Sequence, residues 1–253
     1  MRARVAAVAA LILLAPAARA QSAADHIALG DREYAAMNAE AALAHYEQAV
    51  AADSQGYEAW WKAAREAVGL GEFERDEARR AELFRKGEEY ARRAVAVNPD
   101  DAEGHFNLAR ALGRVALSLG TRDRIKYAGE VREHALRALE LNPDHPGALH
   151  VMGVWNAEVR RLSGLSRMIA RTFLGGGVFG EASWDNAVRY MERAVAVDPQ
   201  RLTHHLDLAR VYADIGQTDK ARAEYELVVN GRATEYNDRF YKEQAAAELE
   251  KLR

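Results

Sequence analysis

The sequence predicts an all-α protein, built as a solenoid of helix pairs stacked side by side. Three near-copies of one phrase carry this prediction: AVAVNPDD at 94–101, ALELNPDH at 138–145 and AVAVDPQR at 194–201. Each phrase is the apolar end of a helix followed by Asn-Pro or Asp-Pro. Proline stops a helix and disfavours helical backbone in the residue before it. Apolar residues resume at helical spacing a few residues after each phrase, so the chain repeats one helical unit.

Composition narrows the protein class. The 253 residues are 49% hydrophobic and 29% charged, which is typical of a globular chain. The absence of cysteine excludes disulfides, Cys-ligated zinc, iron–sulfur clusters and a thiol nucleophile. The net charge of −3 argues against a nucleic-acid partner, because such proteins usually carry a basic excess.

The first 20 residues have the pattern of a secretory signal peptide. Arg2 and Arg4 precede the apolar run Val5–Ala15, and a small-x-small site ends at Ala20. We therefore expect cleavage after Ala20 and a periplasmic or secreted mature protein, residues 21–253. The alternative is an uncleaved anchor, but the run of 11 residues is too short to span roughly 30 Å of hydrocarbon. Losing the three arginines of this segment leaves a mature charge near −6, and no second apolar stretch of membrane length follows.

The repeat unit is clearest over Leu202–Gly231. Alanines stand at its eighth and twentieth positions, Ala209 and Ala221, and tyrosines at its eleventh and twenty-fourth. This pattern resembles the tetratricopeptide repeat, a helix–turn–helix of about 34 residues. Its eighth and twentieth positions are small because the paired helices approach each other there. The same template places a small residue at the eighth position of every unit: Gly30, Ala64, Ala109, Gly153 and Ala209.

In chain order, the template predicts repeats near 23–55, 57–101, 102–145, 146–201 and 202–231. Together they should form a right-handed superhelix, a tetratricopeptide-repeat α-solenoid. The prolines at 99, 143 and 199 lie 44 and 56 residues apart, so the middle repeats are extended. The additions are expected at 72–86, 119–129 and 162–184. The segment 234–252 has Tyr241, Ala245, Leu249 and Leu252 on one face, and predicts a C-terminal capping helix with a polar outer side.

The additions carry a second, more specific resemblance. Over 57–252 the chain is similar to the regulator of microtubule dynamics family, in Gly153-x-Trp155, Val159, Leu162-Ser163, Phe179-Gly180-Glu181, Thr234-Glu235 and Asn237-Asp238. The resemblance implies an all-α repeat domain that binds rather than catalyses. Eukaryotic members are associated with microtubules and organelle surfaces. This chain departs from them at its N-terminus, where the export signal stands, so the family name does not give its function.

The concave surface of such a solenoid is lined by the first helix of each repeat. Its predicted groove residues are Trp61, Arg65, Phe106, Arg110, Arg114, His150, Val154, Leu206 and Arg210. Arginine presents a planar fork suited to carboxylate or phosphate, and aromatic rings supply contact area. We therefore expect the groove to bind an acidic protein or peptide, or a lipid head group. The alternative is that these arginines only solvate an exposed helix face.

The addition at 162–179 is a second candidate surface. It holds the apolar residues Leu165, Met168, Ile169, Phe173, Leu174 and Phe179 between basic flanks. Such a segment lies on a membrane or covers an apolar ligand. The alternative is that it packs into the solenoid as core. Its three consecutive glycines lack the Lys-Ser/Thr ending and preceding strand of a phosphate loop.

Catalytic and metal motifs are not found in the sequence. It has no HExxH, no GxSxG, and no paired histidines on one helix face that suggest a metal site. We therefore expect no enzyme activity, metal or cofactor. The leading interpretation is an exported scaffold for a protein or peptide. The alternative is a carrier for a lipid or another apolar anion.

Overall fold

The computed structural model describes residues 21–119, 121–162, 164 and 180–252. Within these ranges the structure has eleven α-helices and no strand, which confirms the predicted all-α solenoid. The helices are α1 (Ala23–Ala35), α2 (Ala39–Ala52), α3 (Tyr57–Glu72), α4 (Glu77–Val97), α5 (Ala102–Ser118), α6 (Thr121–Leu141), α7 (Pro146–Arg161), α10 (Trp184–Val197), α11 (Leu202–Asp214), α12 (Thr218–Asn230) and α13 (Asp238–Glu250). None of these helices is long and apolar enough to cross a membrane. The predicted signal peptide, 1–20, lies outside the described residues.

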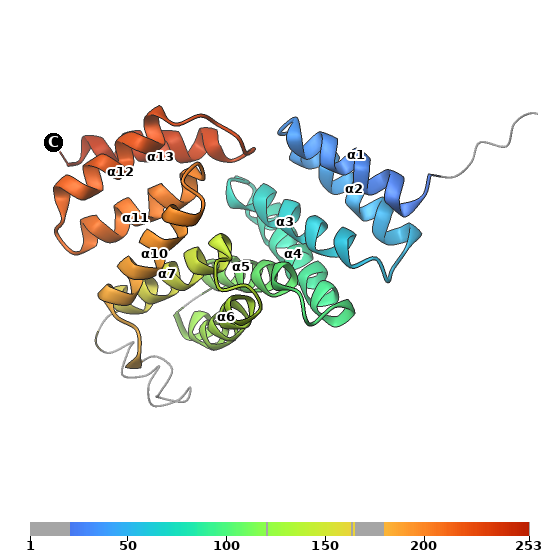
Figure 1. The fold of residues 1–253 in the computed structure, drawn as a ribbon, viewed down its shortest axis with the longest axis horizontal. Helices are drawn as coiled ribbons and strands as arrows, with labels where there is room; N and C mark the ends of the chain where they lie inside the picture. The colour runs from blue at the N-terminus through green and yellow to red at the C-terminus, as the bar shows by residue number, and fades with distance from the viewer. Residues whose placement is uncertain (1–20, 120, 163, 165–179, 253) are drawn as a thin grey trace, which may run out of the picture.

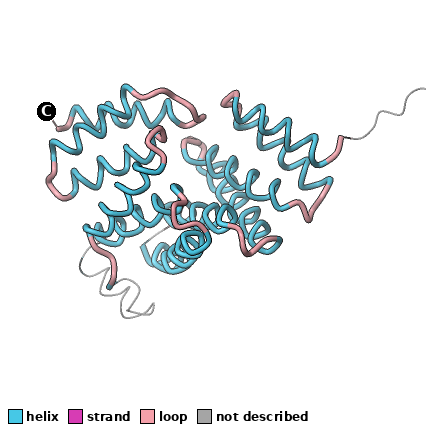
Figure 2. The backbone as a smooth tube through the Cα atoms, viewed as in Figure 1, coloured by secondary structure: helices cyan, strands magenta, loops and turns pink. Residues whose placement is uncertain are grey.

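The helices pack as consecutive antiparallel pairs. α1 lies on α2, α3 on α4, α5 on α6, α7 on α10 and α11 on α12, and α13 packs along α12 (Figure 1). The pairs follow one another in an arc, and short loops connect most of them (Figure 2). This is the architecture of a repeat protein, in which each unit buries its apolar face against its neighbours.

Polar caps fix the helix boundaries. The Ser183 hydroxyl accepts a hydrogen bond from the Asn186 N–H at the start of α10, at 3.1 Å. The Asp101 carboxylate accepts one from the Glu103 N–H at the start of α5, at 2.9 Å. Such caps satisfy backbone donors that have no partner within the helix. The three Pro-containing phrases all lie at helix ends, as their sequence predicts.

Small residues hold the paired helices close together. A Cβ built on Gly30 would lie 2.5 Å from the Tyr46 ring of α2, and one built on Gly153 would lie 2.6 Å from Met191 of α10. Such contacts are far shorter than van der Waals separation. The eighth position of these units therefore has no room for a larger side chain. Ala209, at the same position of the last repeat, is fully buried.

Two histidines repeat one structural role. His105 Nε2 donates to the carbonyl of Pro99 at 2.9 Å, and His205 Nε2 donates to that of Pro199 at the same distance. In both repeats the histidine lies six residues after the proline. The bond ties the turn to the helix that follows and satisfies a carbonyl that proline leaves at a helix end.

Two of the predicted additions lengthen helices. α4 and α6 each have 21 residues, compared with 13 in α12, their counterpart in the last repeat. Residues 72–86 form the end of α3, a short connection and the start of α4. Most of the third addition, 162–184, lies outside the described residues. The helices bury three apolar clusters, centred on α2–α3, on α5–α7 and on α11–α13.

The end of the solenoid returns to its beginning. The loop before α13 approaches the C-terminal end of α1 (Figure 1), and the Tyr34 hydroxyl of α1 donates to Glu235 at 3.1 Å. Phe240 of α13 stacks on Phe73 at the end of α3, with ring centroids 4.4 Å apart. The arc is therefore closed into a ring by residues more than 160 positions apart.

Candidate functional site

The ring encloses a cavity of about 430 Å³. Its walls come mainly from α3, α5, α7 and α11, the first helices of four pairs, and from residues 235–244. This volume lies within the range of small-molecule and peptide side-chain sites. The concave surface predicted from the repeat pattern is therefore a cavity that the C-terminal segment partly closes.

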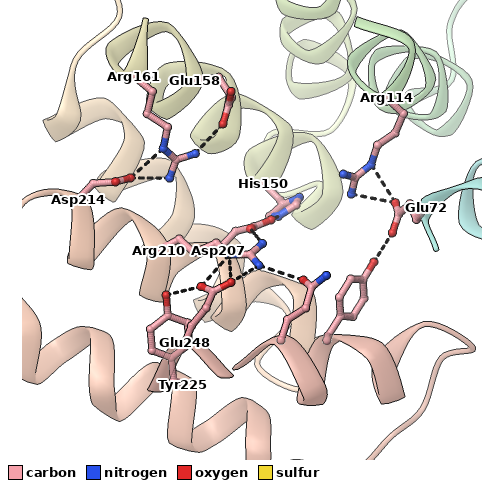
Figure 3. A network of polar contacts seen from close by, with 12 residues as sticks. Glu72, Arg114, His150, Glu158, Arg161, Asp207, Arg210, Asp214, Tyr225 and Glu248 are labelled. Carbon is pink, nitrogen blue, oxygen red and sulfur yellow. Dashed lines mark hydrogen bonds and ion pairs between the residues drawn. The ribbon is translucent and has the colours of Figure 1, made fainter. Parts of the chain in front are cut away.

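One buried carboxylate organises the side of the cavity where the ring closes. Glu72 ends α3 and its side chain is only 3% exposed. Arg110 and Arg114, one turn apart on α5, donate to Glu72 Oε1 at 2.9 and 3.0 Å. Tyr241 and Asn237 donate to its other oxygen, Asn237 at 3.3 Å. We call these five residues the Glu72 cluster; Figure 3 shows Glu72 with Arg114.

Charge sets the ionisation of this cluster. Burial alone would raise the pKa of Glu72, but the guanidinium groups of Arg114 and Arg110 outweigh burial and lower the pKa to about 2. Burial and the Glu72 charge raise the pKa of Tyr241, so its hydroxyl stays protonated and donates. Two guanidinium groups thus share one carboxylate, and the cluster keeps a surplus positive charge.

A second cluster lies on α11 and α13. Arg210 pairs with Asp207 at 3.0 Å and with Glu248 at 2.6 Å. It also donates to Gln244 at 2.9 Å. His150 of α7 donates to Asp207 at 2.9 Å. These five residues form the Asp207 cluster, and Tyr225 also donates to Glu248 (Figure 3).

The Asp207 carboxylate is ionised for a similar reason. Burial would raise the pKa of Asp207, but the hydrogen bond from His150 and the charge of Arg210 hold the pKa well below its ordinary value. Burial and the neighbouring His150 lower the pKa of His204 to about 2, so this ring is neutral. His204 is 1% exposed and lies 5.0 Å from the His150 ring. Neither of its ring nitrogens has a hydrogen-bond partner.

The N-terminal side of the cavity holds a fourth fixed arginine, Arg65. The Arg65 guanidinium lies 3.7 Å from the centre of the Tyr34 ring and donates to Glu66 at 2.6 Å. On α5, Phe106 packs on the His145 ring, 4.7 Å between centroids. A Cβ built on Gly147 would meet Phe106 at 2.4 Å, so glycine makes room for this ring.

The structure brings eight of the nine predicted groove residues to one cavity: Arg65, Phe106, Arg110, Arg114, His150, Val154, Leu206 and Arg210. Trp61 is not among the lining residues; Lys62 and Arg65 lie over its ring, at 5.6 and 5.5 Å from the centroid. The predicted surface formed by Leu165, Met168, Ile169, Phe173, Leu174 and Phe179 lies outside the described residues.

Sequence reasoning missed the carboxylates that hold these arginines. It placed Glu72 at the start of a charged addition and the acidic residues of 234–252 on a polar outer face. That expectation is wrong for Glu248, which contacts Arg210 because α13 turns this part of its surface toward α11. A signal was present at one position only: Asp207 precedes Arg210 by three residues, the spacing of neighbours on a helix.

Other chemistry has little support in the described part of the chain. No group of three or more His, Cys, Asp or Glu side chains there is arranged to hold a metal ion. The histidine pair His105 and His134 has its Nδ1 atoms 2.9 Å apart and lies outside the cavity, near Pro99.

The chain is similar to a family of known proteins over nearly its whole length. The sequence model described as "Regulator of microtubule dynamics protein 1-3" matches residues 23–253. Regulator of microtubule dynamics protein 1 of Bos taurus is 28% identical over 155 residues, which are 61% of this chain and 48% of the relative. The Homo sapiens protein is 28% identical over 147 residues, 58% of this chain and 46% of the relative. The match thus spans about half the length of these relatives.

A solved structure supports the fold independently. A thermophilic tetratricopeptide repeat protein of Thermus thermophilus aligns with a TM-score of 0.64, covering 89% of this chain and 99% of that one at 21% identity. The alignment confirms the tetratricopeptide-repeat solenoid. Repeat solenoids of this kind present an extended concave surface.

Proposed function

The chain belongs to the regulator of microtubule dynamics family, and from this premise we propose that its mature part is an exported scaffold that binds an acidic protein or peptide segment in the cavity. The observation that carries the proposal is the charge of the wall. Among the described lining residues, seven arginines face five carboxylates. The wall is therefore net positive in a chain whose formal charge is −3. Such a contrast attracts and orients an acidic ligand.

The fixed geometry of the arginines supports the same proposal. Arg110, Arg114 and Arg210 are each held by carboxylates at 2.6–3.0 Å, so their side chains are ordered before a ligand arrives. Ordering in advance lowers the entropy cost of binding. Arg114 remains 32% exposed, which leaves part of its guanidinium open to a ligand.

Substitution of two arginines tests this function. Labelled acidic peptides would be titrated into residues 21–253 and followed by fluorescence polarisation. Arg114→Gln with Arg210→Gln should weaken binding about tenfold or more, because each removes a charged hydrogen-bond donor. Arg193→Gln is the matched control, since Arg193 pairs with Asp144 on the exposed outer surface. Equal affinities of the double variant and the control would contradict the proposal.

A second function is favoured by the closure of the ring. Phe106, Val154, Trp155 and Leu206 add apolar surface to the cavity beside the arginines. A partly closed cavity with apolar walls and cationic groups also suits a lipid or another apolar anion, carried rather than presented. Native mass spectrometry of the mature protein from its own source separates the two functions. A bound lipid mass would favour the carrier, and a protein partner would favour the scaffold.

Export is part of the proposal. It is supported by the basic start, the apolar run and the small-x-small site of residues 1–20. An exported protein does not meet microtubules, so we propose a partner outside the cytoplasm. N-terminal sequencing of the protein from its source should give Gln21 as the first residue, whereas an intact Met1 would contradict cleavage.

A further inference from the structure

A short segment between α12 and α13 makes the contacts that close the ring. Residues 234–241, here called the strap, join α12 to the first turn of α13. Glu235 contacts both Tyr34 of α1 and Arg201 at the start of α11, the latter at 2.8 Å. Asn237 donates to the Gly69 carbonyl of α3 at 2.8 Å. The strap therefore spans the two ends of the arc.

The strap is stiff within itself. The Asp238 carboxylate accepts hydrogen bonds from the N–H groups of Thr234 and Glu235, at 2.7 and 2.8 Å, and Asp238 is 1% exposed. Lys242 donates to the Gly231 carbonyl at 2.6 Å and so ties α13 to the end of α12. The strap and α13 are thus fixed to the C-terminal repeat and would move with it as one unit.

The seam between the strap and α3 is much smaller than the helix packing on either side. α13 packs along α12 and α11, whereas it reaches α3 only through a few side chains. These are the contacts of Phe73 with Phe240 and Tyr241, the packing of Tyr236 on the α2–α3 cluster, and the hydrogen bonds of Tyr241 and Asn237 to Glu72 and Gly69. Separating the ring here parts a few aromatic side chains and leaves the packing of the helix pairs intact, so the seam is where opening costs least.

The seam is also a wall of the cavity. Glu235, Tyr236, Asn237 and Tyr241 line it, as does Phe73 on the opposite side of the seam. Opening the seam would therefore uncover the cavity from the side where Arg110 and Arg114 lie.

We propose that the strap is a gate: the ring opens between the strap and α3 to admit the ligand of the cavity, and recloses through Phe240, Tyr241 and Asn237. That the gate admits a ligand rests on the proposed function. That the ring opens at the strap does not depend on it. A ligand acid group bound to Arg110 and Arg114 competes with Glu72 for these arginines, and Glu72 also accepts hydrogen bonds from Tyr241 and Asn237 of the strap. Binding and opening are then coupled through one carboxylate.

Spin-label distances test the opening without any ligand. The chain has no cysteine, so Ala44→Cys and Glu226→Cys, both exposed and on α2 and α12, would be the only labelled sites. We expect one narrow distance distribution in this background. Phe240→Ala removes the stack on Phe73 and should raise the open population about three- to tenfold, seen as a longer distance. Leu249→Ala is the control, since Leu249 packs within the C-terminal cluster.

Ligand entry is tested by stopped-flow binding of 1-anilinonaphthalene-8-sulfonate, an apolar anion. Phe240→Ala should speed its association about three- to tenfold. A bis-maleimide link between Arg75→Cys and Glu243→Cys, exposed residues on the two sides of the seam, should slow association at least tenfold. Leu249→Ala should associate at the rate of the unaltered protein.

Several results would overturn the gate. They are an unchanged distance distribution in Phe240→Ala, failure of the link to form, or entry at an unchanged rate in the linked protein. If the ring opens as expected but neither the probe nor the acidic peptides bind the unaltered protein or any variant, the cavity is not a ligand site. The gate then fails together with the proposed function, while the measured opening stands.

Discussion

Replacing Glu72 by glutamine tests whether one buried carboxylate holds the ring closed. The substitution keeps the shape of the side chain and removes its charge. Arg110 and Arg114 would then face a neutral amide. Breaking a buried ion pair by removing one partner is strongly destabilising, because the remaining charge stays buried without compensation.

The magnitude follows from the ionisation of Glu72. The surrounding arginines and Tyr241 lower its pKa from 4.5 to about 2. Since each tenfold change in proton affinity is worth about 1.4 kcal/mol, the structure favours the carboxylate by roughly 3 kcal/mol over the neutral group. We expect Glu72→Gln to lower the free energy of unfolding by about 2–4 kcal/mol.

Urea unfolding followed by circular dichroism measures this loss. The matched control is Glu40→Gln, because Glu40 also accepts from one arginine, Arg79, at 3.0 Å, but both side chains are more than half exposed. Exposed pairs contribute less than about 1 kcal/mol. A loss of stability in Glu72→Gln no larger than that in Glu40→Gln would refute this reasoning.

The same carboxylate gives a pH signature. Its folded pKa lies below the unfolded value, so its contribution is present above about pH 4.5 and is lost as the pH falls toward 2. Wild-type stability should therefore fall more steeply over this interval than that of Glu72→Gln. If the stability of both proteins falls in parallel with pH, the acid-sensitive stabilisation comes from groups other than Glu72.

Two further predictions use matched sites. Gly30→Ala should cost about 1–3 kcal/mol, because its Cβ would meet the rigid Tyr46 ring at 2.5 Å, whereas Gly113→Ala, with nothing within 4 Å, should gain up to about 1 kcal/mol; equal urea midpoints would contradict the close packing of α1 on α2. The hydrogen bond to Glu224 raises the pKa of His205, so its contribution is full below about pH 6.5 and is lost as the pH rises through the folded pKa. His205→Gln should therefore lose more stability at pH 6 than at pH 9, and a pH-independent loss would refute this assignment.

The repeat pattern was sufficient to predict the fold. Proline at a helix end predicts where the helix stops, because it restricts the backbone next to it. Small residues such as Gly30 and Gly153 predict where two helices approach each other, because a larger side chain would collide with the neighbouring helix. The family resemblance, which the match over 23–253 confirms, also depended on such local phrases. Among them were Thr234-Glu235 and Asn237-Asp238, which prove to form the strap.

The sequence predicted the arginines of the candidate site but not the carboxylates that hold them. Arg65, Arg110 and Arg210 were found because the repeat register places them on the concave face. Glu72 and Glu248 were not, because their partners lie 38 residues away in each case. The periodicity of one repeat gives no information on how distant repeats meet. Closure of the ring is set by the accumulated curvature of five helix pairs, which no single position encodes.

The ring changes how this solenoid should unfold. In an open array each repeat contacts only its neighbours, so unfolding begins at the termini and stability grows with the number of repeats. Here Asn237 contacts Gly69 of α3, and Phe240 contacts Phe73, the residue after α3. The last helix therefore contacts the second repeat as well as its own neighbour. A substitution that destabilises the last helix should then also destabilise the second repeat. Inserting or deleting a repeat would separate the strap from α3 and break the contacts at the seam. The protein gains cooperativity but loses the modularity for which such arrays are known.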